Sequence, residues 1–237
     1  MKAKTTTWIF LLAFAAGMMI FTNSCSKSSS DNSTPVTTVT DIDGNVYHYV
    51  TIGTQVWMVE NLKTTRLNDG TAIPLVADTS WRSLSTPAYC YYSNDIGWKP
   101  IYGPLYNWYA VNTGKLAPTG WHVATDAEWT TLVTYLGGDS LAGGKLKSTG
   151  TVESITGLWY SPNKGATNST GFTAYPGGYR YYNILGFDQI NRIGYWWTGT
   201  MFGASTAYEY YIRYDETTVS REYSIKNCGY SVRCVKN

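Results

Sequence analysis

The spacing of apolar and polar positions divides the chain into segments of different character. Residues 8–21 form an uncharged apolar run, and residues 26–35 are polar and low in complexity. Apolar and polar side chains then alternate over residues 46–52, and Gly53-Thr54 leads into a second apolar stretch at 56–59. Alternation of this kind is typical of half-buried strands, so the pattern predicts a β-hairpin at the start of the folded region.

Two helices are expected in the middle third of the chain. The first covers residues 103–112, with Gly114 just beyond its end. The second begins after Thr125, which is placed to form a capping box with Glu128, and it ends at Gly137-Gly138. Apolar residues recur in this second segment at helical spacing, at Trp129, Leu132, Val133 and Leu136.

Beyond these helices the helical pattern fades. About one further helical turn is expected around residues 141–146, and from residue 158 onward short runs rich in Tyr and Trp alternate with Gly, Asn and Pro. This pattern favours a loop-rich antiparallel sheet closed by the terminal strand. The expected class is α+β, with a twisted antiparallel sheet, two main helices and long irregular loops.

The amino terminus has the features of an export signal. A spanning helix needs about 20 apolar residues, and the run at 8–21 is shorter and follows Lys2 and Lys4. Thr22-Asn23-Ser24-Cys25 resembles a loose lipobox, in which the cysteine takes a diacylglycerol. We therefore predict a lipoprotein signal peptide over residues 1–24, a lipid on Cys25, a polar tether over 25–38 and a folded domain over 39–237. Ordinary signal cleavage is the alternative.

Charge and composition narrow the choice of partner. The chain has 18 Lys and Arg against 16 Asp and Glu, and two of the lysines fall in the predicted signal peptide, so the mature chain is formally neutral. Nucleic acid is therefore not expected as a partner, because phosphate binding calls for a basic excess. With ten Trp and 21 Tyr against six Phe, part of the aromatic content is expected at a surface, with the polar tips in water.

The cysteines are Cys25, Cys90, Cys228 and Cys234. In an oxidising compartment, a disulfide is expected among the three cysteines that are not lipidated. Cys228 and Cys234 would stand roughly 20 Å apart if the terminal segment is a strand, which is beyond disulfide reach. The expected bridge therefore joins Cys90 to one of those two, and it leaves one thiol free.

Several motifs in this order resemble the domain family named for the Fibrobacter succinogenes major paralogous proteins. The resemblance spans about residues 41–237 and is carried by residues 56–62, 102–111, 118–123, 125–129, 165–168, 171–172, 176–180, 195–197 and 231–235. It departs from the family at Ala117, where a cysteine is usual, and at Cys228, where Asn or Gly is usual. The family is similar in pattern to the C-type-lectin-like fold of formylglycine-generating enzymes. The resemblance to the family therefore implies this fold, but it implies no particular activity.

Catalytic patterns are weak. The copper-binding thiol pair of a formylglycine-generating oxidase has no counterpart here, and there is no Gly-x-Ser-x-Gly or phosphate loop. His48 and His122 lack a cysteine or carboxylate at metal-ligand spacing. Asp41, Asp43 and Asn45 have the spacing of a calcium loop but are better explained as a turn. Paired carboxylates for glycoside hydrolysis stay open as an alternative. Most carboxylates of the second half are interpreted as solvated or salt-bridged, in a set that comprises Glu153, Asp188, Glu209, Asp215, Glu216 and Glu222. No enzyme, cofactor or metal is expected.

Binding is the remaining hypothesis. Tyr and Trp give rigid contact area, and their flat faces can stack on sugar rings. The ligand-binding candidates are Tyr182, Trp196, Trp197, Tyr208, Tyr210 and Tyr211. Packing of these rings within the sheet is the competing interpretation. Because adjacent strand residues face opposite sides, at least one of Trp196 and Trp197 is expected in the core.

The expected function is ligand binding by an outer-membrane lipoprotein facing the periplasm or the cell surface. The ligand is a glycan or a protein. An accessory subunit of an outer-membrane uptake or secretion complex is the alternative, and an enzyme of the formylglycine-generating type is a lesser one.

Overall fold

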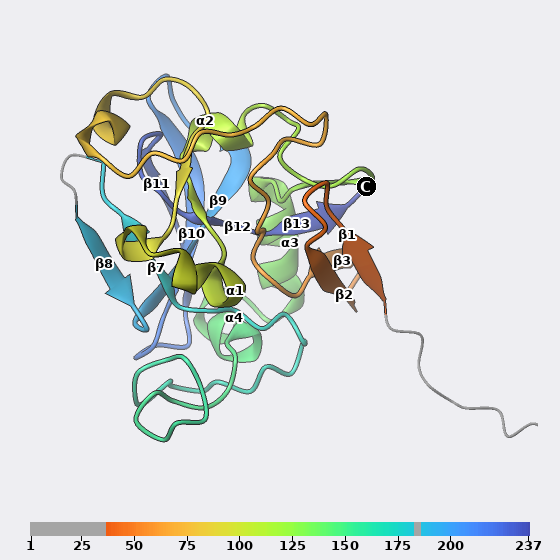
Figure 1. The fold of residues 1–237 in the computed structure, drawn as a ribbon. Coiled ribbons are helices and arrows are strands. Elements are labelled where there is room, and N and C mark those ends of the chain that lie inside the picture. Colours follow the sequence, from red (N-terminus) through yellow and green to blue (C-terminus); the bar gives the residue numbers. More distant parts are fainter. Residues whose placement is uncertain (1–36, 183–185) are drawn as a thin grey trace, which may run out of the picture. The chain divides into compact units, whose positions relative to one another are not determined.

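The computed structural model describes residues 37–182 and 186–237. One antiparallel sheet has the strand order β1-β2-β3-β13-β6 (Figure 1). Its strands are β1 (Thr38–Thr40), β2 (Val46–Ile52), β3 (Gln55–Met58), β6 (Trp121–Val123) and β13 (Cys234–Lys236). The predicted hairpin is confirmed as β2 and β3, with Val50 opposite Trp57. Gly53 (φ +62°) occupies the left-handed region in its turn, where glycine is favoured.

Strand β1 begins slightly closer to the amino terminus than the predicted start of the folded domain. Strand β1 begins at Thr38 and pairs with β2, although residues 25–38 were predicted as tether. The predicted signal peptide, the lipidation site Cys25 and most of the tether lie outside the described residues. In the part of the chain that is described, no helix is long and apolar enough to cross a membrane.

A second sheet has the order β11-β10-β9-β7-β8, with β12 paired to β9. Its strands are β7 (Gly177–Arg180), β8 (Phe187–Ile190), β9 (Ile193–Met201), β10 (Thr206–Arg213), β11 (Val219–Ile225) and β12 (Ser231–Val232). Strands β9, β10 and β11 form an antiparallel meander, as expected. Strands β7 and β12 pair with β9 in parallel, which corrects the purely antiparallel prediction. A short sheet of β4 (Tyr89–Cys90) and β5 (Leu105–Tyr106) stands apart.

The second predicted helix is confirmed, and the first is largely wrong. Helix α3 (Asp126–Tyr135) begins with the predicted capping box of Thr125 and Glu128, and α4 (Asp139–Leu146) follows directly. Residues 103–112 instead contain β5 and the single-turn helix α2 (Trp108–Val111). The remaining short helices precede this region, namely η1 (Thr79–Ser83), η2 (Tyr92–Asn94), η3 (Ile96–Trp98) and α1 (Lys99–Tyr102). The described fold is mostly β with few helices, which is compatible with the α+β class.

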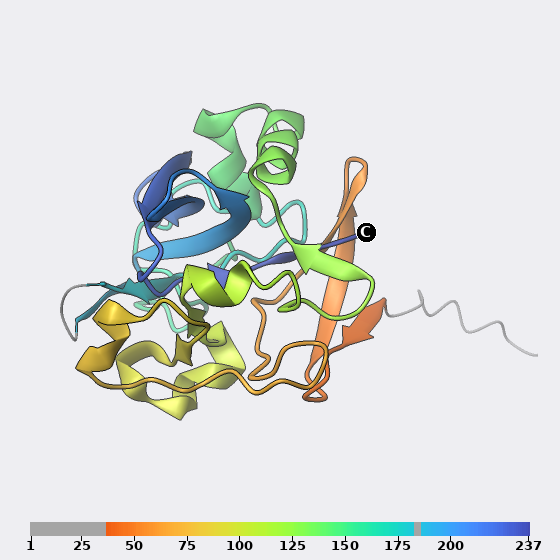
Figure 2. The ribbon, with the colours of Figure 1, turned by 90° about the horizontal axis from the view of Figure 1, so that it is seen from above.

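Side chains of β9 pack on both faces of the second sheet. On one face Trp196 packs with Trp129 of α3 and Tyr210 of β10. On the other face Trp197 packs with Tyr230 and with the segment that carries β4, β5 and α2. Figure 2 shows the helical layer of α3 and α4 on one side of this sheet and the segment of residues 79–111 on the other. The sheet is therefore covered on both sides around Trp196 and Trp197.

Candidate functional site

The six predicted binding aromatics fall into three separate places. Trp196 and Trp197 are fully buried, and Tyr210 is buried against Trp129 with ring centroids 5.0 Å apart. These three rings pack the core and offer no face to a ligand, so their assignment to a binding site is corrected. Tyr208 lies on the helical side of the second sheet, where its ring is 4.0 Å from the Arg221 guanidinium. Only Tyr182 and Tyr211 belong to an aromatic surface on the opposite face.

That surface is a line of tyrosines, here called the tyrosine row. Its ring centroids follow one another at 4.9 Å (Tyr182 to Tyr181), 6.0 Å (Tyr181 to Tyr179), 5.2 Å (Tyr179 to Tyr195) and 5.2 Å (Tyr195 to Tyr211). Tyr181 is 39% exposed, and the other four are partly buried. Tyr179, Tyr195 and Tyr211 lie on β7, β9 and β10, so the sheet fixes the spacing of these three rings. Tyr181 and Tyr182 follow directly after β7.

Buried aromatic residues support the tyrosine row from beneath. Tyr230 stacks on Tyr195 with centroids 5.0 Å apart and nearly parallel rings, and it also contacts Trp197 at 4.5 Å. Burial raises the pKa of Tyr195, and nearby Glu209 adds to this effect. The hydroxyl therefore stays protonated and able to donate a hydrogen bond at physiological pH.

Glu209 is the polar residue of this face that sequence reasoning placed wrongly. It was interpreted as solvated or salt-bridged, yet it is 4% exposed, and its Oε2 has no hydrogen-bond partner among the described residues. Burial raises the pKa of Glu209 to about 7, while hydrogen bonds from Tyr230 and Ser224 oppose the rise. Its position between Tyr208 and Tyr210 on a strand was the available signal, because a strand covered on both sides buries successive residues.

Other polar groups border the tyrosine row. Asp188 of β8 lies opposite Tyr179, and Glu222 of β11 lies opposite Glu209. Arg213 of β10 pairs with Asp215 (Nε to Oδ1, 3.1 Å) and Glu216 (3.3 Å), so its charge is matched within the loop that follows the strand. The face thus combines ring surfaces with carboxylate acceptors, and among the described residues Asp188, Glu209 and Glu222 form no salt bridge.

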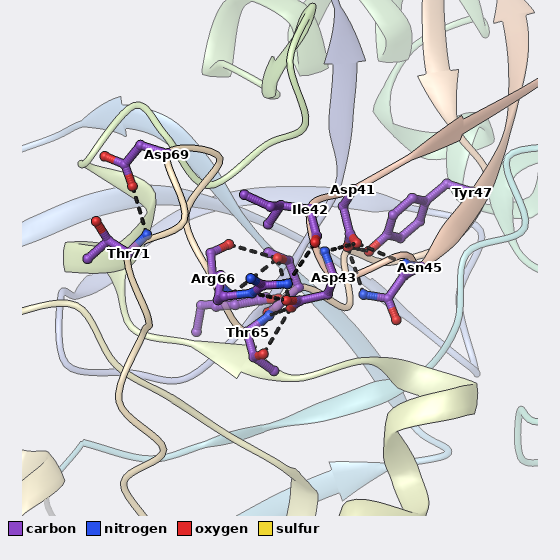
Figure 3. Close-up of polar contacts among 11 residues, drawn as sticks. Asp41, Ile42, Asp43, Asn45, Tyr47, Thr65, Arg66, Asp69 and Thr71 are labelled. Atoms are coloured by element: carbon purple, nitrogen blue, oxygen red, sulfur yellow. Dashed lines mark hydrogen bonds and ion pairs between the residues drawn. The ribbon is translucent and has the colours of Figure 1, made fainter.

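The turn of Asp41, Asp43 and Asn45 is held by hydrogen bonds to the carboxylates of its two aspartates. Figure 3 shows Asp41 accepting hydrogen bonds from the backbone of Asp43 and Asn45 and from the Tyr47 hydroxyl. Asp43 accepts from Thr65 and from the Arg66 guanidinium. Burial raises the pKa of Asp43, but these hydrogen bonds outweigh it and lower the pKa to about 2. Protein donors engage both carboxylates, as the turn interpretation predicted.

The two histidines each find a glutamate that sequence spacing did not reveal. His48 Nδ1 lies 2.7 Å from Glu60 Oε1, and His122 Nε2 lies 2.7 Å from Glu128 Oε1. Glu128 is the capping-box residue of α3, so His122 is tied to the start of that helix. Across residues 37–182 and 186–237, no group of three or more His, Cys, Asp or Glu side chains is placed to hold a metal ion.

The expected disulfide is not formed. Cys90, Cys228 and Cys234 are buried free thiols in the described part of the chain. Cys90 packs with Trp81, Ala88 and Leu105, whereas Cys228 and Cys234 belong to the cluster around Trp197. The cysteines are thus held in different packing environments, and burial raises the pKa of Cys90 and of Cys228 to about 12.

These features define a mostly β domain with partly exposed tyrosines along one face of its second sheet. The sequence model of the Fibrobacter succinogenes major domain matches residues 50–236, and the chain belongs to this family. Comparison with curated proteins and with solved structures gave no match.

Proposed function

We propose that this chain is an exported lipoprotein, anchored in the outer membrane through a lipid on Cys25, whose C-type-lectin-like domain binds a glycan without catalysis. The observation that carries the proposal is the tyrosine row, with partly exposed rings held at fixed spacing by β7, β9 and β10. Flat aromatic faces stack on the apolar faces of sugar rings, and the neighbouring carboxylates of Asp188 and Glu222 can accept hydrogen bonds from hydroxyl groups.

A glycan array probed with the full chain in detergent tests this proposal. Tyr181→Ala and Tyr211→Ala should each weaken binding at least tenfold, about 1.4 kcal/mol, because each removes one ring face. Tyr223→Ala is the matched control, since this exposed tyrosine lies in the strand of β11 but faces the helical side with Tyr208. Absence of any glycan signal, or an equal loss in Tyr223→Ala, would contradict the proposal.

A subunit of an outer-membrane complex is the second candidate, and a different surface favours it. Phe202 and Tyr223 stack with centroids 4.1 Å apart and are 48% and 53% exposed, next to Tyr208 and Arg221. Aromatic and arginine side chains of this kind are enriched at protein interfaces. Co-purification of a membrane partner that Phe202→Ala abolishes, with glycan binding absent, would favour this function over the first.

A further inference from the structure

Glu209 is a buried acid on the tyrosine-row face with no positive partner. Its Oε2 lies out of contact with solvent and has no hydrogen-bond partner among the described residues. Glu222 lies directly opposite on β11, so two carboxyls face each other across the strand pair. Tyr230 and Ser224 donate hydrogen bonds to Glu209 but carry no positive charge. Like charges directly opposite one another destabilise a sheet, and a buried carboxylate without an opposite charge is costly. This arrangement is complementary to a positive charge.

The arginines of β10 and β11 are already paired with other carboxylates. Arg213 is held by Asp215 and Glu216. Arg221 lies on β11 but faces the helical side, where it pairs with Asp126 at 2.6 Å. The two carboxyls are therefore not matched by the arginines of their own strands.

Aromatic rings border the two carboxyls. Tyr211 is two residues from Glu209 on β10 and therefore shares its face, and the ring of Tyr195 lies 5.2 Å from that of Tyr211. Tyr230 closes the base of this region by stacking on Tyr195. Aromatic faces attract organic cations, and the attraction grows where water is excluded. Acidic groups beside ring faces are suited to an ammonium group more than to a neutral hydroxyl.

Building on the proposed function, we propose that Glu209 and Glu222, together with Tyr195 and Tyr211, form a subsite for the protonated amine of an amino-sugar residue. Glu222 is exposed, so the amine enters from its side and approaches the buried carboxyl of Glu209. The sugar ring then lies along the tyrosine row. A free amine is protonated and supplies a positive charge that balances the two carboxylates, whereas an acetylated amine is neutral.

The test uses the full chain in detergent and a matched pair of probes, the glucosamine tetramer and the N-acetylglucosamine tetramer. Calorimetry near neutral pH should show the free-amine probe binding at least tenfold more tightly. Glu209→Gln keeps the shape of the side chain and should abolish this preference. Glu222→Gln should reduce it in part, and Glu153→Gln, a carboxyl on a distant loop, should leave it intact.

Glu222→Gln also serves as the second test if Glu209→Gln fails to fold, as judged by circular dichroism. Equal affinity of the wild-type chain for the two probes would overturn the subsite, as would a preference that survives Glu209→Gln. In either case binding of the acetylated probe, or of another neutral glycan on the array, would leave the proposed function standing. The absence of every glycan signal would overturn both.

Discussion

Arg233 and Arg180 are buried cations whose guanidinium groups face backbone carbonyls. Arg233 donates to the carbonyls of Met58, Val59 and Phe172 and to the side chain of Asn61. Arg180 donates to the carbonyls of Val76 and Asp78. Both arginines, and Asn61, come from the motifs that make the family recognisable. These motif residues therefore hold distant segments together, and they do not belong to the tyrosine row.

Replacing Arg233 should be strongly destabilising. Arg233→Met leaves several buried carbonyls without a donor, and each unsatisfied acceptor costs about 1–3 kcal/mol, so we expect the free energy of unfolding to fall by about 3 kcal/mol or more. Urea denaturation followed by tryptophan fluorescence measures the loss. Arg82→Met, at an exposed position of η1, is the matched control and should change stability little. Equal stabilities of the two variants would contradict this role.

Glu209 should make the stability of the unliganded domain depend on pH. Its pKa rises from 4.5 to about 7 on folding, so between these values the folded chain holds a proton that the unfolded chain has lost. The free energy of unfolding should therefore fall as pH rises from about 4.5 to 7, by on the order of 3 kcal/mol at about 1.4 kcal/mol per pKa unit. Above about pH 7 this contribution levels off.

Glu209→Gln should remove that dependence. The variant should match the wild type near pH 4 and become more stable than it above pH 7, because glutamine carries no charge to bury. Thermal or urea unfolding of both proteins across this range measures the difference. Parallel stability profiles for the two proteins would show that Glu209 does not titrate as described.

The site residues show what alternation along a strand can predict. The rule that adjacent residues face opposite sides placed at least one of Trp196 and Trp197 in the core, and both are buried because both faces of β9 are covered. Tyr182 and Tyr211 fall in the tyrosine row as aromatic candidates. The aromatic neighbours of Glu209 were a signal for its burial, but its hydrogen bonds from Tyr230 and Ser224 could not be deduced, since both residues come from a later part of the chain.

At the scale of elements, the sequence predicted helices correctly where contacts between residues close in the sequence determine the structure. The capping box of α3 forms within four residues, and it was found from the sequence. The helix expected at 103–112 does not form over that range, because Leu105 and Tyr106 pair with residues 89–90 as a strand. Asn107 then caps α2 by accepting a hydrogen bond from the backbone of Ala110.

Helix α4 was underestimated for a related reason. Its Gly143 and Gly144 disfavour a helix by local propensity. A Cβ at Gly143 would lie 2.7 Å from the Thr217 carbonyl, and one at Gly144 would lie 2.5 Å from the Gly165 carbonyl. The glycines let distant loops approach the helix closely, which local propensity does not register.

Removing the cap of α3 should weaken the domain by a modest amount. Thr125→Ala deletes the hydroxyl that accepts from the Glu128 backbone, and such a loss typically costs about 1 kcal/mol. Thr134→Ala, an exposed position of the same helix, is the control and should keep or slightly raise stability, because alanine favours helix. Urea midpoints distinguish the two. A Thr125→Ala midpoint equal to that of the control would contradict the capping role.

At the scale of the whole molecule, the last seven residues join the two main sheets. Ser231 and Val232 pair with β9 in the second sheet, and residues 234–236 lie between β3 and β6 in the first. Arg233, between these strands, is the buried donor described above. The extent of the folded domain could be predicted from motifs, but this connection could not, because it depends on pairing between segments far apart in the sequence.

Truncation tests the connection directly. Removing residues 231–237 should abolish cooperative unfolding, because both sheets lose a strand and two core clusters lose Val232, Cys234 and Val235. Circular dichroism and urea denaturation measure this outcome. Removing Asn237 alone deletes only terminal contacts, including the one to His122, and should leave a cooperative transition. A cooperative transition in the longer truncation would show that the sheets are stable apart.

The position of β13 also affects the timing of folding. Its residues are synthesised long after those of β3 and β6, yet they lie between these two strands in the sheet. Until translation reaches them, β3 lacks its partner on that side and the core around it stays incomplete. The nascent chain therefore presents an open strand edge, the kind of surface that chaperones protect, until β13 has been synthesised.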